Sequence, residues 1–168
     1  MSIDKSYYQT PLGEMLGAAE GGAVVGLWFV EEQRFLPEER DGWRLRPDAP
    51  VLRRLGRWLD AYFAGQNPAI GFPLDARGSE FRRAVWAHLR AIPYGQTATY
   101  GGIAAAIGAE QRRCRPPAAQ AVGGAVGHNP IGIVIPCHRV VGADGSLTGY
   151  GGGLWRKTAL LELEGARR

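Results

Sequence analysis

The sequence predicts an α+β protein: a small sheet domain followed by a mainly helical domain with a helix-turn-helix. β-rich apolar runs and one helical stripe occupy the first half of the chain, and short helices separated by turns occupy the second. Of the 25 glycines, 14 lie within residues 95–153, and the net charge is −2 for residues 1–78 but +6 for residues 79–168. We therefore predict a supporting α/β domain with its linker in residues 1–78 and a second, functional domain in residues 79–168.

The first domain is expected to form strands followed by one helix. Tyr7–Leu16 is typical of a strand pair, and Ala23–Val30 is a β-rich apolar run. A polar loop follows. The next helix is expected to begin at an Asp48 N-cap and to stop at Gly65, because its apolar residues recur at helical spacing. Residues 68–78 are expected to form a linker.

The second domain is expected to be helical. Ser79 can cap a helix that ends before Pro93, and Thr99 can cap a short helix stopped by Gly108. After an Arg-rich loop, residues 118–127 predict another short helix made mainly of Ala, Val and Gly. Two short helices with a connection are the layout of a helix-turn-helix, although many unrelated proteins also contain such a pair.

Composition excludes several classes of protein. The chain is 45% hydrophobic and 21% charged, which is typical of a globular protein rather than a disordered one. Two cysteines cannot form a disulfide framework, the first residues lack an apolar signal core, and Pro, Gly, Gln and Asn interrupt both long uncharged stretches. We expect a cytoplasmic monomer that does not enter a membrane. The basic second domain indicates an anionic partner such as nucleic acid, with ordinary solubilising charge as the alternative.

The most informative stretch is Pro136-Cys137-His138-Arg139. The apolar run Ile133–Ile135 before it predicts a buried strand, which Pro136 ends because proline cannot continue a β-ladder. Cys137 would then be held at a strand tip, as a nucleophile requires. A free thiol has a pKa of about 8.5 and an apolar site raises it, so a reactive cysteine needs a base or positive charge nearby. We expect an ionised sulfur, with His138 reaching it through a water or a turn.

Two other interpretations of Cys137 remain open. It can be a buried, inert cysteine followed by a surface His-Arg pair. A zinc site is disfavoured, because the chain has only three His and two Cys, without paired ligand spacing.

Pro136–Val140 resembles the active-site signature of the O6-alkylguanine-DNA alkyltransferases, also called methylated-DNA–protein-cysteine methyltransferases. Asn129-Pro130 upstream, and Gly149-Tyr150 with a glycine triplet downstream, belong to the same pattern. The similarity extends from about Phe81 to Gly165. The first domain is similar to the family's amino-terminal domain, a small sheet with helices of ribonuclease-H-like topology.

The resemblance implies direct DNA repair by residues 79–168. An alkyl group would move from O6-alkylguanine, or from O4-alkylthymine, to the sulfur of Cys137. The thioether has no good leaving group, so each protein molecule would act once. His138 would be the water-mediated base, and Glu164 would orient it and stabilise the imidazolium. No cofactor and no metal are implied.

Further roles follow from the same resemblance. Asn129 would brace the backbone that carries the nucleophile, and Tyr100 would donate a proton or hydrogen bond to the guanine ring. The base pocket would be lined by Val140, Tyr150 and Gly151.

The implied partner is double-stranded DNA that contains alkylated guanine. The target base lies inside the duplex and must be rotated out, at a cost of a few kcal/mol. The second helix of the helix-turn-helix would enter the minor groove, where small residues permit close approach; ordinary helix packing is the alternative explanation for them. The residues expected at the DNA are Ala118, Ala119, Ala121, Gly123 and Gly124, together with Arg139.

One position departs from the family pattern. The family usually carries an arginine that fills the gap left by the flipped base, and Gln120 stands there instead. Glutamine can insert and hydrogen-bond the orphaned cytosine, but it lacks the charge and stacking plane of arginine. The preceding loop, residues 110–117, is longer than usual. We expect its Arg112, Arg113 and Arg115 to contact phosphate and to replace part of the missing charge.

Three classes of function therefore compete. The first is the alkyltransferase. The second is a non-catalytic lesion-binding or regulatory protein on the same scaffold, against which Cys137 argues because relatives that only bind lesions lack this nucleophile. The third is an unrelated cysteine hydrolase using Cys137, His138 and Glu164, which would need an oxyanion hole and would turn over. The combined motifs favour the first.

Overall fold

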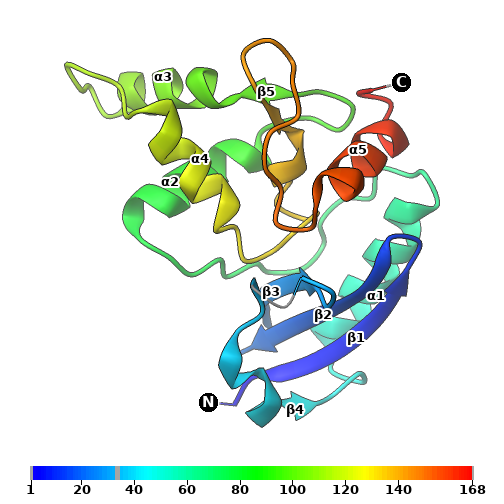
Figure 1. Ribbon diagram of the computed structural model, residues 1–168. Coiled ribbons are helices and arrows are strands. Elements are labelled where there is room, and N and C mark those ends of the chain that lie inside the picture. Colours follow the sequence, from blue (N-terminus) through cyan, green and yellow to red (C-terminus); the bar gives the residue numbers. More distant parts are fainter. Residues whose placement is uncertain (1, 33–34, 168) are drawn as a thin grey trace. The chain divides into compact units, whose positions relative to one another are not determined.

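The computed structural model describes residues 2–32 and 35–167, and it contains a sheet-rich part and a helix-rich part (Figure 1). These parts form two compact units. Unit 1 holds the residues up to Arg77 together with Pro130–Gly132, and unit 2 holds Gly78–Asn129 and the residues from Ile133 onward. The predicted α+β class is confirmed. None of the helices in the described ranges is long and apolar enough to cross a bilayer.

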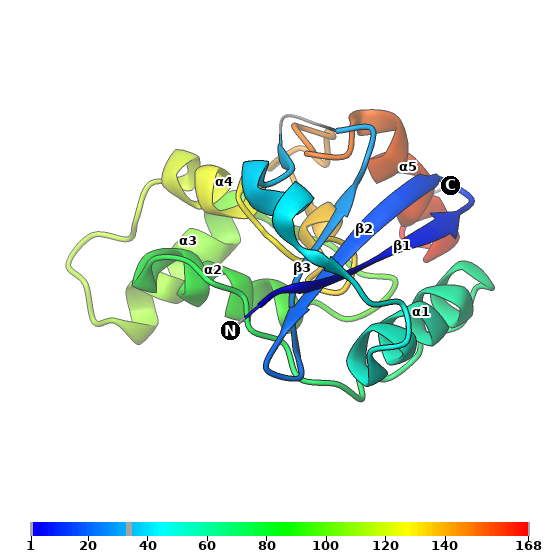
Figure 2. The ribbon, with the colours of Figure 1, turned by 90° about the horizontal axis from the view of Figure 1, so that it is seen from below.

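Unit 1 is built on a four-stranded sheet in the order β3-β2-β1-β4 (Figure 2). β1, β2 and β3 are antiparallel neighbours, and β4 runs parallel to β1. The turn between β2 and β3 is Gly21-Gly22, both at positive φ, as a tight hairpin requires. The predicted strands are confirmed, and a short 3-10 helix and β4 lie in the predicted loop. The bounds are β1 (Asp4–Thr10), β2 (Gly13–Glu20), β3 (Ala23–Phe29), η2 (Glu38–Gly42) and β4 (Arg44–Leu45).

Helix α1 (Pro50–Phe63) packs on this sheet through the predicted apolar stripe. Tyr8 of β1 donates a hydrogen bond from its hydroxyl to the Leu52 carbonyl, at 2.7 Å. A Cβ at Gly17 would lie 2.7 Å from the Tyr8 ring, so glycine is needed where strand and helix approach. The buried residues of the stripe are Val51, Leu52, Leu55, Trp58, Leu59 and Tyr62.

The start of α1 differs from the prediction. Ala49 rather than Asp48 is the N-cap, and no side chain caps the helix. The Asp48 carboxylate instead pairs with Arg46, with 3.1 Å between Nε and Oδ1. Pro50 begins the helix, where its missing N–H has no cost. Gly65, the predicted stop, has a φ of +87° just beyond the helix, which is typical of a C′ glycine.

Two extended segments cover the outer edge of β3. Val24 exchanges backbone hydrogen bonds of 2.9 and 2.8 Å with residues 73–75, within the predicted linker. Leu27 does the same with Pro130–Gly132, at 2.8 and 3.0 Å. An uncovered strand edge exposes unpaired backbone groups, so these contacts complete the sheet. The second segment comes from the half of the chain predicted to belong to the other domain.

Unit 2 contains four α-helices and a short parallel strand pair among its described residues. Ser79 and Thr99 cap their helices as predicted, each accepting a hydrogen bond from the third backbone N–H that follows, at 3.2 and 3.0 Å. Trp86 of α2 donates its indole N–H to the Ala125 carbonyl of α4, at 2.8 Å. The bounds are α2 (Glu80–Arg90), β5 (Ala98–Thr99), α3 (Tyr100–Glu110), α4 (Ala119–Gly127), η3 (Cys137–Arg139), β6 (Val140–Val141) and α5 (Leu154–Leu163).

Helix α3 does not stop at Gly108 as predicted but continues to Glu110. Gly108 serves packing instead, because a Cβ there would lie 2.8 Å from Cα of Pro116. The glycine thus lets the connection between α3 and α4 rest against the helix. Residues 111–118 form this connection, which is longer than the turn of an ordinary helix-turn-helix.

The predicted strand Ile133–Ile135 is also wrong. These residues are buried, but they form a turn in which Ile133 has a φ of +66°. The Asn129 side chain donates a hydrogen bond to the Ile135 carbonyl, at 2.7 Å, so a side chain satisfies a group that a neighbouring strand would otherwise pair. A short apolar run indicates burial, but its burial does not distinguish a strand from a turn.

Replacing the glycines near the two ends of α3 by alanine should change the free energy of unfolding in opposite directions. Gly101→Ala meets open space and should raise the free energy of unfolding by about 0.5–1 kcal/mol, through helix propensity alone. Gly108→Ala gains the same propensity but collides with the Pro116 backbone, so a net loss of about 1–2 kcal/mol is expected. Urea unfolding followed by circular dichroism measures both. Equal stabilisation by the two substitutions would contradict this packing role.

Candidate active site

Cys137 opens the 3-10 helix η3 rather than standing at a strand tip. Its backbone N–H donates to the Ile135 carbonyl at 2.8 Å, and Arg139 N–H donates to the Pro136 carbonyl at 3.0 Å. The side-chain amide of Asn129 donates to the same Ile135 carbonyl. The cysteine is thus held by a compact turn and one bracing amide, which is the position that the resemblance implied for Asn129.

His138 and Glu164 form a buried pair beside this turn. Both side chains are 0% exposed, and Nε2 of His138 lies 2.7 Å from Oε2 of Glu164. Because a carboxylate only accepts, Nε2 carries the proton. The other ring nitrogen, Nδ1, is a buried side-chain polar atom with no hydrogen-bond partner among the described residues. An acceptor nitrogen is therefore available on the residue that follows Cys137.

Arg139 also binds the Glu164 carboxylate of this pair. Its Nε donates to Glu164 Oε1 at 2.7 Å and its Nη2 to Oε2 at 3.0 Å. Its Nη1 donates to the Ile92 carbonyl at 2.7 Å. The Arg139 side chain is only 11% exposed. The guanidinium expected at the DNA therefore lies inside the protein, where it binds the carboxylate that holds His138.

The electrostatics keep this base neutral. Burial lowers the pKa of His138, and the hydrogen bond and negative charge of Glu164 oppose that shift. Arg139 adds to the lowering. The imidazole is accordingly uncharged near neutral pH, and its Nδ1 can take a proton.

The resting protonation state of Cys137 differs from the ionised sulfur expected from the sequence. Burial raises the pKa of its thiol, so the resting group is protonated at neutral pH. A hydrogen bond with Asn129, the charge of Lys157 and two backbone N–H groups each lower the pKa in part. The thiol is thus neutral until a base removes its proton, while the groups that favour the thiolate are already in position.

Lys157 was missed by sequence reasoning. It lies on α5 with 0% exposure, and its Nζ donates to the Thr148 carbonyl at 2.9 Å. Burial lowers its pKa to about 8, and the negative charge on Cys137 opposes that shift. A signal was present in the sequence: Lys157 falls at helical spacing on the same stripe as Leu160, Leu161 and Glu164. Lysine is almost never fully buried unless it is paired, so a lysine within an apolar stripe calls for a partner.

Tyr100 lies near this lysine at the start of α3. Lys157 Nζ is 6.0 Å from the centroid of the Tyr100 ring, and the Thr148 hydroxyl donates to the tyrosine oxygen at 3.1 Å. The ring also contacts α4, because a Cβ at Gly123 would lie 3.7 Å from it. Of the residues expected in the base pocket, Val140 is buried in β6, whereas Tyr150 and Gly151 are partly exposed in the loop before α5.

Helix α4 buries one face and exposes the other. Val122, Ala125 and Val126 are buried against the rest of the unit. The small residues singled out in the sequence lie on the other face, so internal packing does not account for most of them. The exposed residues are Ala118, Ala119, Gln120, Ala121 and Gly124; Gly123 is half-buried.

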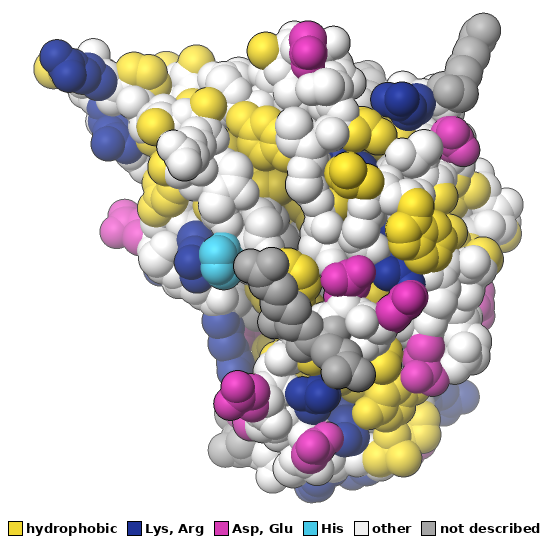
Figure 3. All heavy atoms as spheres, in the orientation of Figure 1, with side chains coloured by type: hydrophobic (Ala, Val, Ile, Leu, Met, Phe, Trp, Pro, Cys, Tyr) yellow, Lys and Arg dark blue, Asp and Glu magenta, His cyan; other side chains and the backbone are white. Residues whose placement is uncertain are grey.

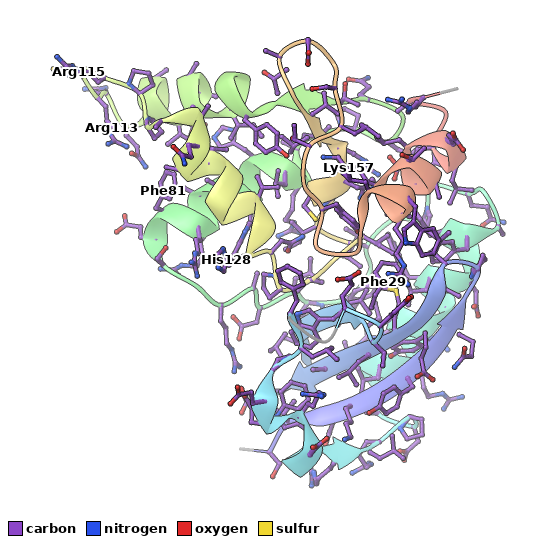
Figure 4. All side chains as sticks on the ribbon, in the orientation of Figure 1. Phe29, Phe81, Arg113, Arg115, His128 and Lys157 are labelled. Carbon is purple, nitrogen blue, oxygen red and sulfur yellow. The ribbon has the colours of Figure 1, made fainter. Side chains whose placement is uncertain are left out.

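The connection between α3 and α4 is exposed and basic. Arg112, Arg113 and Arg115 are exposed, and Arg112 has a φ of +51°. Figure 4 shows Arg113 and Arg115 extending from this connection, and Figure 3 shows Lys and Arg side chains gathered at the same corner. Cys114 in this segment is also exposed and free.

Comparisons with known proteins identify the family of both halves of the chain. Residues 80–166 match the family described as 6-O-methylguanine DNA methyltransferase, DNA binding domain, and residues 3–76 match its ribonuclease-like domain. The chain belongs to the methylated-DNA–protein-cysteine methyltransferase family. The predicted resemblance, including the ribonuclease-like first domain, is thereby confirmed.

Individual relatives cover nearly the whole chain. The methylated-DNA–protein-cysteine methyltransferase of Mycobacterium tuberculosis is 47% identical over 164 residues, which span 96% of this chain and 93% of that protein. The solved structure of the M. tuberculosis O6-methylguanine methyltransferase has a TM-score of 0.84 and 43% identity, covering 99% of this chain and 94% of that one. The same protein in complex with DNA gives a TM-score of 0.83 at 44% identity, with coverage of 99% and 94%.

Removing the charge of Lys157 should make Cys137 less reactive. In a Cys114→Ser background, Lys157→Met is expected to raise the apparent pKa of Cys137, because the cation that lowers it is absent. Alkylation by iodoacetamide at pH 7.5 should then slow by about tenfold for each unit of pKa. In the parent protein this assistance weakens as pH rises through about 8, where Lys157 loses its proton.

The chain offers a matched control for this measurement. Lys5 is its other lysine and belongs to unit 1, so Lys5→Met should leave the pH–rate profile of alkylation unchanged. Identical profiles for the Lys157→Met variant and the parent would contradict the role assigned to this cation.

Proposed function

We propose that the protein repairs DNA by moving an alkyl group from O6 of guanine to Sγ of Cys137. The bond between the alkyl carbon and Sγ forms as the bond between that carbon and O6 breaks, leaving guanine in the DNA and a thioether on the protein. Displacement at carbon needs a soft nucleophile, and a thiolate is the best that side chains supply. The observation that carries the proposal is the buried, neutral His138 beside Cys137, held by Glu164.

His138 acts as the base in this proposal. Its Nδ1 has no partner among the described residues, so it can accept the Cys137 proton through one water. The imidazolium that forms is stabilised by Glu164, whose carboxylate is already 2.7 Å from Nε2. Arg139 holds that carboxylate in place through its own hydrogen bonds. We therefore assign Arg139 to this network rather than to the DNA.

Two further residues assist departure of the base. The charge of Lys157 favours the thiolate. Tyr100, whose oxygen accepts a hydrogen bond from Thr148, donates a proton or hydrogen bond to the guanine ring. The negative charge that leaves with O6 is thereby neutralised on the purine. Asn129 braces the turn, while Val140, Tyr150 and Gly151 surround the base.

The exposed face of α4 provides the DNA contact. Small side chains at Ala118, Ala119, Ala121 and Gly124 are exposed there and let the helix backbone approach the minor groove. Gln120 lies on the same exposed face, and we propose that it enters the stack where the alkylated nucleotide has rotated out. O4-alkylthymine presents the same alkyl–oxygen chemistry and is a second substrate in this proposal.

We also propose a cytoplasmic location. Both cysteines are free, and the reaction consumes a reduced thiol, which a reducing compartment maintains.

The central test uses a duplex that contains one O6-methylguanine. One added methyl group is expected on the peptide that contains Cys137, measured by mass spectrometry, with stoichiometric loss of the lesion. Cys137→Ser should bind the duplex without accepting the group. Glu164→Gln should slow transfer by about 10²-fold or more with lesion binding retained, because the imidazolium loses the negative charge that stabilises it.

Two outcomes would overturn this proposal. Lesion binding without any transfer would indicate a non-catalytic damage-binding protein. Removal of many methyl groups per protein molecule, with Cys137 left unmodified, would indicate a hydrolase.

The basic connection predicts a salt effect. Replacing Arg112, Arg113 and Arg115 together by Gln should weaken duplex binding and reduce the slope of log Kobs against log salt by about 0.9 for each phosphate that the variant no longer neutralises. Filter binding at several salt concentrations measures this slope. The matched control replaces three exposed arginines of α1 in unit 1, Arg53, Arg54 and Arg57, and should leave the slope unchanged. An unaltered slope in the first variant would remove these arginines from the DNA interface.

A further inference from the structure

Helix α5 begins with two consecutive buried cations. Arg156 is 1% exposed and Lys157 is 0% exposed, both within the first turn. Positive charge is unfavourable there, because a helix N-terminus already carries partial positive charge. The first turn contains no acidic residue, and the N-cap, Gly153, supplies no side chain. Local partners must therefore offset the cost of placing both cations here.

Those partners are two carbonyls of the segment Thr148–Gly153, which we term the glycine-rich loop. Lys157 Nζ donates to the Thr148 carbonyl at 2.9 Å, and Arg156 Nη1 donates to the Gly152 carbonyl at 2.8 Å. The two hydrogen bonds tie the two ends of the loop to the same turn of α5. Within the loop, Gly153 N–H donates to the Tyr150 carbonyl at 2.9 Å, which closes the turn between the two tied ends.

Arg156 is further enclosed on two sides. Its guanidinium carbon lies 4.4 Å from the centroid of the Trp155 ring. Trp155 is 56% exposed, so its indole covers the guanidinium at the surface. The positive charge of Arg156 also acts on Tyr150, where it partly offsets the strong rise in pKa that burial of the phenol causes. The guanidinium thus lies against the loop that carries two of the three residues assigned to the base pocket.

Ordering a loop with four glycines costs more backbone entropy than ordering an ordinary loop, and these contacts offset part of that cost. Glycine loses more backbone freedom on ordering than any other residue, and a loop that becomes ordered only on binding reduces the affinity by that entropy. A loop fixed beforehand offers its backbone groups to the base without that cost. Residues 149 and 151–153 are the glycines concerned.

We propose that Arg156 is a positioning residue that fixes the glycine-rich loop against which the extruded base is held. Its effect falls on the geometry of the base, not on the reactivity of the Cys137 thiol. In this it differs from its neighbour Lys157, whose charge acts on the sulfur. The inference rests on the proposed alkyl transfer. It identifies Arg156 as a residue that orders one wall of the proposed base pocket.

The test compares Arg156→Met with the parent protein, both in a Cys114→Ser background. The single-turnover rate constant of methyl transfer from a saturating O6-methylguanine duplex should fall by about tenfold or more, because small misplacement of reacting groups is costly. Alkylation of Cys137 by iodoacetamide should change by less than about twofold, because Lys157 and its effect on the thiol pKa remain. Hydrogen–deuterium exchange of the peptide covering residues 148–153 should become faster.

Three variants sharpen this comparison. Arg156→Lys retains a donor for the Gly152 carbonyl and should restore much of the transfer rate and of the loop's protection from exchange. Arg57→Met removes an exposed charge of α1 and should match the parent in every readout. If Arg156→Met fails to fold, Trp155→Ala decides the question, because it uncovers the guanidinium at an exposed position and should accelerate loop exchange and slow transfer.

Each contrary outcome is specific. Unchanged loop exchange in Arg156→Met, or in Trp155→Ala where the former does not fold, would overturn the proposal. So would parallel losses of transfer and thiol alkylation, which would indicate an effect on Cys137. A parent protein that never methylates Cys137 would refute the proposed function, whereas the exchange measurement would still report whether Arg156 fixes the loop.

Discussion

The carboxylate of Glu164 is the group on which the rest of the site depends. It is fully buried, and a buried charge is tolerated only where partners satisfy it. It accepts one hydrogen bond from His138 and two from Arg139. These bonds join the C-terminal end of α5 to η3 and decide which nitrogen of His138 carries the proton. Without this carboxylate the imidazole has neither a fixed orientation nor compensation for the charge that it would gain in its proposed role as base.

Burial of the site sets the protonation state of both Cys137 and His138 at rest. Burial raises the pKa of Cys137 and lowers that of His138, so both groups are neutral before DNA binds. A protonated thiol reacts slowly with stray electrophiles and oxidants. In the proposed reaction, which uses the thiol once, that restraint protects the capacity for repair. Lys157, Asn129 and two backbone N–H groups oppose the shift in the thiol pKa, so they reduce the free-energy cost of proton transfer to His138.

The segment that leads into the active-site turn is itself held by backbone hydrogen bonds. Pro130–Gly132 is hydrogen-bonded to Leu27 at the edge of β3, and the next residue, Ile133, adopts positive φ. The turn that ends at Cys137 therefore begins directly after a segment that is hydrogen-bonded to β3. Asn129, immediately before that segment, binds the Ile135 carbonyl and braces the turn again. The backbone on both sides of Ile133 is thus held by hydrogen bonds.

The sequence by itself determined the family, the three strands and the helix of the first domain, and the helix caps Ser79 and Thr99, because these depend on local spacing and on a specific motif. The same motif singled out Cys137 and His138 as the candidate nucleophile and base. Only the tertiary structure decided that Ile133–Ile135 is a turn, that Gly108 receives Pro116, that Arg139 binds Glu164, and that Pro130–Gly132 joins the first sheet. It also decided that the thiol is neutral at rest and that Arg156 and Lys157 are buried together. Each of these depends on which distant groups meet, and on how much water they lose when they do, and neither quantity is a property of a local stretch of chain.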